Sequence, residues 1–441
     1  MPAPAAVVAA AGASPLVPAP QPAPAEPVEL CAPGDTACVQ RLATPGAVAC
    51  WGSRHAWGPA PAEQPAAALA ASTADDGYGG LAPAPSASYP EDDGSSDAAT
   101  AAAVVANASV PTPLGSSLVF STISAEDNYV CGLTSRGTIA CFGSTTPMLP
   151  DDPNYLPPTE LPFEGPFTKL ATGATFACGL LANFSAACFG RMGDCQLWSG
   201  PGGSEARPTP LVVGGGLQFV ELVAGSDHVC GVLFNGSAAC WGSNSANQLG
   251  VDSADVATSL TPIAIADPSL AFVSLAAADT VSCGTLINAS VACWGGYTDA
   301  SQSELLPPQP RIVGADQIAS LAARGSSMCG VTLQGQAGCA GVVGSYIDAQ
   351  GYPETVFSEQ PTPVPSPASF TTITVGGSGF YFHACGLTLE GAALCWGLNN
   401  EGQLGVPPYE VANSTAAVPV ATDIRFSVLS AGGDYTCGVV A

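Results

Sequence analysis

Short apolar segments separated by turn-forming residues recur in a fixed order along most of the chain. The clearest copy, residues 219–244, begins with a phenylalanine, reaches a cysteine eleven positions later and a second cysteine after ten more. Val232, Leu233, Ala238 and Ala239, which lie between the two cysteines, favour strands over loops. Because the same order of residues returns six times, the chain contains an internal repeat, and the repeat determines the fold.

The repeat is defined by three features around its cysteines. An apolar residue stands eleven positions before the first cysteine at Phe120, Phe167, Phe219, Phe272 and Ile318. Glycine follows the first cysteine in all six copies. An aromatic residue and a glycine follow the second in five copies, and Ala340-Gly341 is the exception.

The constant spacing of the cysteines predicts a hairpin. The six pairs are Cys131 and Cys141, Cys178 and Cys188, Cys230 and Cys240, Cys283 and Cys293, Cys329 and Cys339, and Cys385 and Cys395. If the two cysteines of a pair face each other across antiparallel strands, a three-residue loop remains, which favours a type I turn followed by a left-handed residue. Glycine, which has no Cβ, occupies that left-handed position at Gly137, Gly236, Gly335 and Gly391. Opposed strand residues lie within reach of a disulfide, so we predict one disulfide-linked hairpin per repeat, each contributing at most about 3 kcal/mol.

Two further segments extend the repeat to about seven copies. Residues 28–52 align with a whole copy through Cys38 and Cys50, with a hairpin two residues longer, and a last copy stops at Ala441 soon after Cys437. Two ways of closing the structure are open. In the favoured one, Cys38 pairs with Cys50 and the polypeptide continues past Ala441. In the other, Cys437 pairs with Cys50 and the N-terminal strand completes the last unit.

The length of the repeat selects the architecture. First cysteines of the six pairs stand 46 to 56 residues apart, which suits four short strands per unit. An open stack of such sheets would leave two exposed edges, whereas a closed ring protects them. The predicted fold is therefore all-β, a seven-bladed β-propeller with one disulfide-linked hairpin per blade. A β-solenoid fits less well because its repeats are shorter.

Composition divides the chain into four parts. Residues 1–27 are rich in alanine and proline and predict a disordered, extended segment. Residues 28–58 are the predicted first propeller repeat. Residues 59–117, rich in Ala, Pro, Ser, Gly and Asp, predict a disordered linker or insertion. Residues 118–441 hold the remaining propeller repeats, the last of them incomplete.

Charge and cysteine usage exclude several classes of function. The net charge of −26 argues against nucleic acid as a partner, because phosphate binding needs a basic face. Seventeen regularly spaced cysteines indicate an oxidising compartment. With only three histidines and no Cys-x2-Cys, we expect no metal site and no cofactor. No apolar run is long enough to span a bilayer.

The motifs Ala224-Gly225, Cys230-Gly231, Cys240-Trp241-Gly242 and Gln248-Leu249-Gly250 resemble the regulator of chromosome condensation repeat. The paired cysteines make the chain similar to the extracellular branch of that family, as in the ectodomains of plant crinkly-type receptor kinases. The resemblance covers residues 28–52 and 118–441 and implies a seven-bladed propeller. The exchange-factor activity of the family's intracellular founder is not implied, because this chain is acidic and no residues match the founder's catalytic loop.

No residue pattern indicates catalysis. Neither a nucleophile elbow nor a zinc-protease or phosphate-binding motif occurs, so we predict no catalytic residue and no enzyme. His228 and His383 precede a first cysteine where other copies have Tyr129, Phe176 or Tyr435, and this indicates a packing or hydrogen-bonding role. The recurring tryptophans Trp51, Trp241, Trp294 and Trp396 indicate packing between blades, and the aspartates Asp35, Asp127, Asp227, Asp279 and Asp434 indicate turn capping.

Five asparagines fit the N-glycosylation rule: Asn107, Asn183, Asn235, Asn288 and Asn413. Asn183, Asn235 and Asn288 each fall five residues after a first cysteine, at a predicted hairpin tip, where asparagine is also a favoured turn residue. Both interpretations stay open. Cys31, Cys195 and Cys437 lie outside the regular pairs. Three alternatives stay open for Cys195, which could be free, bridge Cys31 or form an intermolecular disulfide, and Cys437 could also form an intermolecular one.

These features predict a non-enzymatic glycoprotein, extracellular or at the cell surface, whose propeller is an interaction or assembly module of a coat, wall or filament. Its expected partners are other extracellular or cell-surface proteins or glycans. The Ala-Pro and Ser-Pro runs resemble segments of plant and green-algal wall proteins. The alternative is the ligand-binding ectodomain of a crinkly-like membrane receptor, and an extracellular hydrolase is a less favoured third class.

Overall fold

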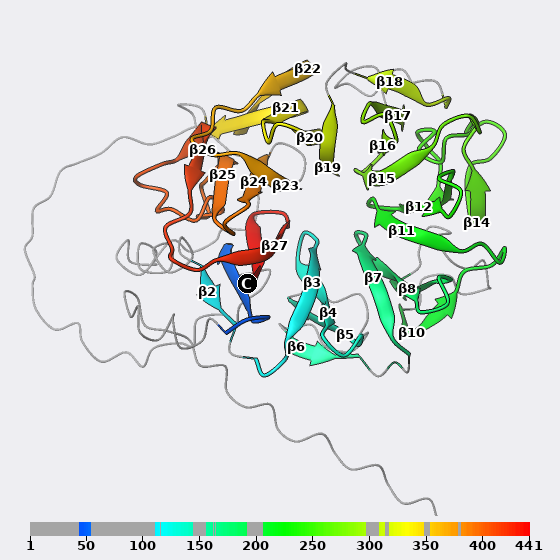
Figure 1. Cartoon of the computed structure of the whole chain (residues 1–441), viewed down its shortest axis with the longest axis horizontal. Coiled ribbons are helices and arrows are strands. Elements are labelled where there is room, and N and C mark those ends of the chain that lie inside the picture. Colours follow the sequence, from blue (N-terminus) through cyan, green and yellow to red (C-terminus); the bar gives the residue numbers. More distant parts are fainter. Residues whose placement is uncertain are drawn as a thin grey trace, which may run out of the picture.

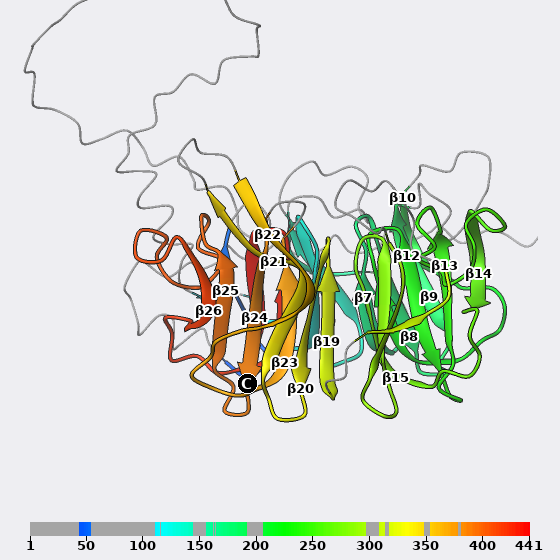
Figure 2. The same ribbon diagram turned by 90° about the horizontal axis from the view of Figure 1, so that it is seen from above.

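The computed structural model describes residues 44–53, 111–114, 116–143, 156–161, 163, 165–191, 206–296, 308–313, 317–347, 353–377 and 381–441. All regular structure in these ranges is β-strand, organised as seven four-stranded antiparallel sheets. The sheets stand around a central opening, and the innermost strand of each sheet faces that opening (Figure 1, Figure 2). The predicted all-β, seven-bladed propeller is confirmed.

The strands of each blade are given from the inside of the ring outward. Blade 1 contains β3 (Phe120–Ala125), β4 (Tyr129–Thr134), β5 (Ile139–Gly143) and β6 (Leu156–Glu160); blade 2 contains β7 (Phe167–Thr172), β8 (Phe176–Leu181), β9 (Ala186–Arg191) and β10 (Ala206–Val212). Blade 3 contains β11 (Phe219–Ala224), β12 (His228–Leu233), β13 (Ala238–Ser243) and β14 (Thr258–Ala264); blade 4 contains β15 (Phe272–Ala277), β16 (Val281–Leu286), β17 (Val291–Gly295) and β18 (Arg311–Val313). Blade 5 contains β19 (Ile318–Arg324), β20 (Ser327–Thr332), β21 (Ala337–Ile347) and β22 (Pro353–Pro363); blade 6 contains β23 (Phe370–Gly376), β24 (His383–Thr388), β25 (Ala393–Leu398) and β26 (Asn413–Pro419). Blade 7 contains β27 (Phe426–Ala431), β28 (Tyr435–Val440), β1 (Val48–Gly52) and β2 (Thr112–Pro113).

The cysteine pairs with the ten-residue spacing occupy the predicted register, directly opposite each other in the hairpin between the second and third strands of a blade. Disulfides with Cα–Cα distances of 4.0–4.1 Å join all six of them. The bonds of blades 1 to 6 join Cys131 with Cys141, Cys178 with Cys188, Cys230 with Cys240, Cys283 with Cys293, Cys329 with Cys339, and Cys385 with Cys395. In each of these blades the first cysteine therefore lies on the second strand and the second cysteine on the third.

The hairpin turns also have the predicted backbone geometry. The left-handed residues of four turns are Gly137, Gly236, Gly335 and Gly391, with φ of 78–83°. Phe184 and Ala289 hold the same position in blades 2 and 4, at φ 67° and 64°. The turn type is thus kept where glycine is absent.

In six blades, the glycine after the first cysteine and the phenylalanine at the start of the innermost strand form one packing motif. A Cβ added to Gly231 would lie 2.4 Å from Cδ1 of Phe219, so only glycine lets the phenyl ring lie flat over the second strand. The same close approach of a phenylalanine ring occurs at Gly132, Gly179, Gly284, Gly386 and Gly438. The repeated glycine and phenylalanine therefore reflect a close contact between the first and second strands of these six blades.

The recurring tryptophans pack between blades, as the sequence indicates. Trp241 of blade 3 lies in one buried cluster with Phe219 of its own blade and Phe176 of blade 2. The ring centroids of Phe219 and Trp241 are 5.6 Å apart. Trp51 and Trp294 also donate a hydrogen bond from Nε1 across a blade boundary, to the carbonyl oxygens of Gln403 and Gln248, each at 3.0 Å.

The ring is closed by strands from the two ends of the chain in blade 7, which corrects the favoured sequence-based pairing. Strand β1 pairs with β28, Cys50 lies opposite Cys437, and a disulfide joins them. The prediction that Cys50 pairs with Cys38 is therefore wrong, and Cys437 is not available for an intermolecular disulfide. Strand β1 thus serves as the third strand of the last blade and not as part of a separate first repeat.

Several predictions fall on residues that the structure does not describe. They are the segment 1–27, residues 28–43 and 54–58 of the proposed first repeat, nearly all of the segment 59–117, Cys31, Cys38, Cys195 and the sequon at Asn107. What the sequence indicates for these residues remains a prediction.

Candidate functional site

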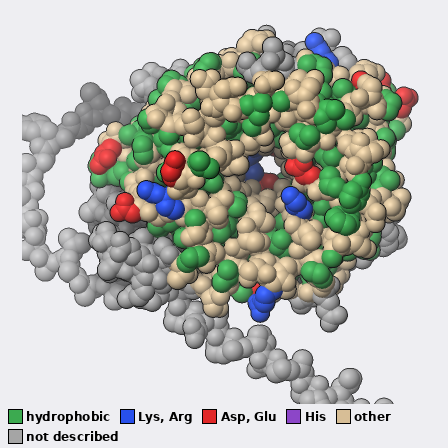
Figure 3. Space-filling model, in the orientation of Figure 1, with side chains coloured by type: hydrophobic (Ala, Val, Ile, Leu, Met, Phe, Trp, Pro, Cys, Tyr) green, Lys and Arg blue, Asp and Glu red, His purple; other side chains and the backbone are tan. Residues whose placement is uncertain are grey.

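The inner strands of all seven blades line a central cavity of about 220 Å³. Its wall consists mainly of short side chains, among them Ala125, Ala171, Ala224, Ala276, Ala322 and Ala431 with the hydroxyl residues Ser124, Thr172, Thr374 and Ser430. Because these side chains are short, the opening is visible through the ring (Figure 3). The channel is the natural place to look for a site in this fold.

Hydroxyl groups of the channel wall hold neighbouring inner strands together. The backbone N–H of Ala125 donates to Oγ of Ser430 at 2.8 Å, and that of Ala431 donates to Oγ1 of Thr374 at 3.0 Å. Ser124 Oγ and Thr172 Oγ1 lie 2.6 Å apart. These hydroxyls are therefore engaged between blades 6, 7, 1 and 2.

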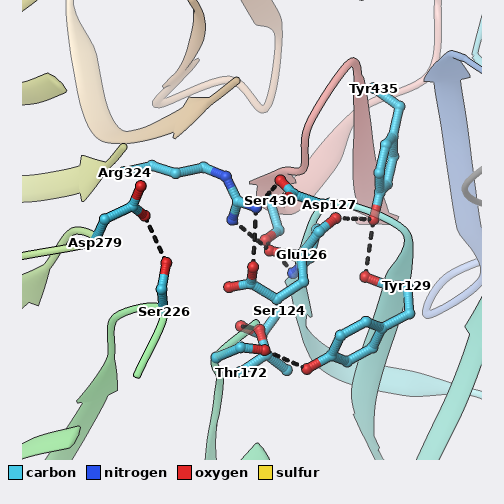
Figure 4. Close-up of polar contacts among 12 residues, drawn as sticks. Ser124, Glu126, Asp127, Tyr129, Thr172, Ser226, Asp279, Arg324, Ser430 and Tyr435 are labelled. Atoms are coloured by element: carbon cyan, nitrogen blue, oxygen red, sulfur yellow. Dashed lines mark hydrogen bonds and ion pairs between the residues drawn. The ribbon is translucent and has the colours of Figure 1, made fainter. Parts of the chain in front are cut away.

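A buried ion pair crosses one mouth of the channel. Arg324, at the end of β19 in blade 5, reaches blade 1, where its guanidinium donates to Oε2 of Glu126 at 2.9 Å and to Oδ1 of Asp127 at 2.7 Å (Figure 4). The side chains of Arg324 and Glu126 are only 13% and 11% exposed, whereas that of Asp127 is 51% exposed. We call the contact of Arg324 with Glu126 and Asp127 the cross-ring ion pair, because blades 1 and 5 are not neighbours.

The loop that carries Glu126 is fixed from the adjacent blade. The hydroxyl of Tyr435 in blade 7 lies 2.7 Å from the carbonyl oxygen of Glu126 and 2.8 Å from that of Tyr129. At the same mouth, Ser226 donates to Oδ1 of Asp279 at 2.6 Å (Figure 4). The polar groups around this mouth are thus oriented by one another.

Burial and the neighbouring charges determine the ionisation of Glu126 and Arg324 at this mouth. Burial raises the pKa of Glu126 to about 7, and the adjacent Arg324 guanidinium opposes that rise. The Arg324 guanidinium itself keeps a pKa above its usual value: burial alone would lower it, but the charges of Glu126 and Asp127 outweigh burial. The arginine therefore stays charged, while the charge of Glu126 changes near neutral pH.

Sequence reasoning missed the cross-ring ion pair, although a signal for it exists. Glu126 and Arg324 both stand five residues before a first cysteine. Four other copies have glycine or alanine there: Gly173, Gly225, Ala278 and Gly432. Most copies have one of the smallest residues at this position, and two copies have opposite charges. This pattern could have revealed the contact.

The two histidines that precede a first cysteine are buried hydrogen-bonding residues. Nε2 of His228 lies 2.8 Å from Oγ of Ser282 in blade 4, and Nε2 of His383 lies 3.0 Å from Oγ1 of Thr436 in blade 7. Each contact joins one blade to the next. Burial lowers the pKa of His228 to about 4 and that of His383 to about 3, so both are neutral at physiological pH.

These shifts predict how stability depends on pH. A histidine whose pKa is lowered in the folded state stabilises the fold above its ordinary pKa of 6.5, and this contribution is lost as the pH falls through the folded value. Glu126 and Glu221, whose pKa values burial raises to about 7, act in the opposite sense and favour the fold below 4.5. Between pH 4.5 and 6.5 the two effects oppose each other, and below 4.5 the histidines dominate.

We therefore expect His228→Phe, which installs the residue found at this position in blade 2, to protect against acid. The free energy of unfolding of the variant minus that of the wild type should be about 3 kcal/mol larger at pH 3.5 than at pH 7. Urea titration of both proteins at each pH measures this difference. A difference between the two proteins that does not change with pH would show that His228 does not resist protonation in the fold.

The predicted modification sites lie where the hairpin register puts them. Asn183, Asn235 and Asn288 are exposed at the turns between the second and third strands of blades 2, 3 and 4, and Asn413 is exposed at the start of β26. Glycosylation at these four positions stays a prediction. The described ranges contain no group of three or more His, Cys, Asp or Glu arranged to hold a metal ion. They also contain no helix long and apolar enough to cross a membrane.

The geometry defines a β-propeller of seven blades, each containing a disulfide. Residues 219–248 and 377–403 match the family described as "Regulator of chromosome condensation (RCC1) repeat". The resemblance recognised in the sequence is therefore confirmed for these two segments, which match repeats of this type.

Two solved structures, of human WBSCR16 and of Prp20p, show the same fold. Human WBSCR16 is 15% identical, with a TM-score of 0.67 over 89% of this chain and 98% of that chain. Prp20p from Saccharomyces cerevisiae, whose structure was described with its binding to Gsp1p and histones, is 16% identical, with a TM-score of 0.65 over 90% of this chain and 92% of that chain. The CRINKLY WD40 ectodomain of the Arabidopsis thaliana receptor kinase ACR4 is 22% identical over 73% of this chain and 92% of that chain, with a TM-score of 0.45. At these identities the first two structures establish the fold and not the partner.

Proposed function

We propose that this protein is a secreted or cell-surface glycoprotein whose propeller is a rigid interaction module of an extracellular coat, wall or filament. The observation that carries the proposal is the disulfide in every blade, seven among the described residues. Cytosolic thiols are kept reduced, whereas secreted proteins keep such bonds, so a chain built around them belongs in an oxidising compartment.

The channel supports an interaction role better than a catalytic one. Catalysis needs a polar group free to meet a substrate, usually in a cavity with converging polar side chains. Here Arg324, Glu126 and Asp127 are paired with one another, and Asp279 already accepts a hydrogen bond from Ser226. The channel therefore works as a structural axis, and recognition falls to the outer surfaces of the ring.

Glycosylation is consistent with the placement of the sequons. Asn183, Asn235 and Asn288 project from consecutive hairpin tips and are exposed. A sugar attached at such a tip would displace no core side chain. Three neighbouring blades would then carry sugar on the same face of the ring.

The proposal is tested on intact cells that make the protein. A membrane-impermeant biotin reagent should label it, or it should be found in the medium, and mass spectrometry should find N-linked sugar at Asn183, Asn235 or Asn288. If the protein is found only inside the cell, where the reagent does not label it, and its paired cysteines are thiols, the proposal is overturned.

A further inference from the structure

The three sequon tips share one local geometry. At each tip, Oδ1 of the asparagine accepts from the backbone N–H of the serine two residues later, at 3.0–3.1 Å, and from the serine hydroxyl, at 2.6–2.7 Å. The tips lie on the face of the ring where β28 and the chain end (Figure 2). We call this the hairpin-tip face; it is the face shown in Figure 3, where hydrophobic side chains are spread around the ring and charged ones are few.

Two phenylalanines on this face are exposed, so packing in the core does not explain why these positions are aromatic. Phe184 directly follows Asn183 in blade 2, and Phe234 directly precedes Asn235 in blade 3. They are 42% and 61% exposed, and their rings meet edge to face with centroids 4.9 Å apart. An aromatic pair thus joins two neighbouring sequons across a blade boundary.

The backbone at Phe184 is strained. Phe184 is left-handed, with φ of 67°, at a turn position where four other blades have glycine. For a bulky residue this conformation costs about 1 kcal/mol or more. Ala289 has the same conformation in blade 4, at φ 64°, so the turn itself requires it, but at Phe184 the strained residue also carries a bulky, exposed side chain.

We infer that Phe184 and Phe234 form the aromatic surface against which the first sugar of the N-linked glycans at Asn183 and Asn235 packs. This inference rests on the glycosylation in the proposed function. The C–H bonds on one face of a pyranose ring carry partial positive charge, and the face of an aromatic ring is negative. A sugar attached one residue away is held beside the ring at high effective concentration, so it would occupy the aromatic surface ahead of a free partner.

The sequon-free tips support this choice of occupant. Blades 5 and 6 have aliphatic Leu333 and Leu389 at the position of Phe234, and the tip of blade 1 has Ser135 there. Among the described hairpin tips, exposed aromatic residues therefore occur only at those with a sequon, in blades 2 and 3, whereas the sequon tip of blade 4 has the aliphatic Ile287 at this position. With sugars over blades 2 and 3, the parts of the hairpin-tip face left open to a protein partner include those around Leu333 and Leu389, which are 56% and 83% exposed.

The test is nuclear magnetic resonance of the glycosylated protein with isotope-labelled sugars. Protons of the first sugar at Asn183 or Asn235 should be shifted upfield by the phenyl ring current, relative to the same protons at Asn413 on the outer strand β26. The variant Phe184→Gly/Phe234→Ser, which uses residues that other blades have at these positions, should remove the shift while mass spectrometry finds unchanged occupancy.

The outcomes separate this inference from the proposed function. Occupied sites whose sugar protons match those at Asn413 would overturn the inference alone. Absence of sugar from Asn183 and Asn235 alone would overturn the inference, and its absence from Asn288 and Asn413 as well would also overturn the glycoprotein assignment. If sedimentation shows that the glycosylated wild type self-associates and the Phe184→Gly/Phe234→Ser variant does not, a second copy of the chain occupies the pair and the inference fails.

Discussion

The double variant Cys50→Ala/Cys437→Ala is expected to lose up to about 6 kcal/mol of unfolding free energy, about twice the loss from removing any other disulfide described here. The bond joins residues 387 apart in sequence, whereas the other six join residues 10 apart. In the chain-entropy model a cross-link restricts the unfolded chain more when it closes a longer loop, which gives ceilings of about 6 and about 3 kcal/mol.

Cys131→Ala/Cys141→Ala is the matched control, because it removes a similarly buried disulfide and the same atoms from blade 1. Urea unfolding of both variants under non-reducing conditions measures the difference. Equal losses would mean that closing the ring covalently adds nothing beyond an ordinary hairpin disulfide.

Arg324→Met is expected to cost about 3–5 kcal/mol at pH 8, because removing one partner leaves the carboxylate of Glu126 buried without compensation. The loss should be smaller at pH 5, since burial raises the pKa of Glu126 to about 7 and the carboxyl can be neutral there. Adding Glu126→Leu should recover part of the stability, because an apolar pair avoids the cost of the buried charge.

Arg136→Met supplies the matched control for this variant. Arg136 pairs with Glu160 in the same blade, but the two side chains are 65% and 34% exposed, and exposed pairs contribute less than about 1 kcal/mol. Thermal or urea unfolding of both variants compares the two pairs directly. If Arg324→Met were as mild as Arg136→Met, the cross-ring ion pair would not stabilise the ring.

Most of the blade could be predicted from the sequence because its determinants are local. The spacing of Cys131 and Cys141 fixes the register of a hairpin, and Gly137 fixes its turn. The closing strands could not be predicted in this way, because residues 28–52 match a repeat whether Cys50 pairs with Cys38 or with Cys437. A repeat pattern gives the residue types of each strand, but it does not determine which strand pairs with it. That pairing follows from how the ring closes.

The candidate site was harder to predict for a related reason. Glu126 and Arg324 are 198 residues apart and occupy the same position of two repeats. Sequence comparison makes such positions equivalent but does not bring them together. Their contact depends on the width of the channel, which follows from the number of blades and the short side chains on the inner strands.

Peptide mapping of the unreduced protein tests the central claim most directly. Digestion with thiols blocked should yield Cys50 linked to Cys437 and the six pairs linked at a spacing of ten residues, each within one blade. Cys50 linked to Cys38, or cysteines linked from one hairpin to another, would contradict the proposed closure of the ring and the register of its blades.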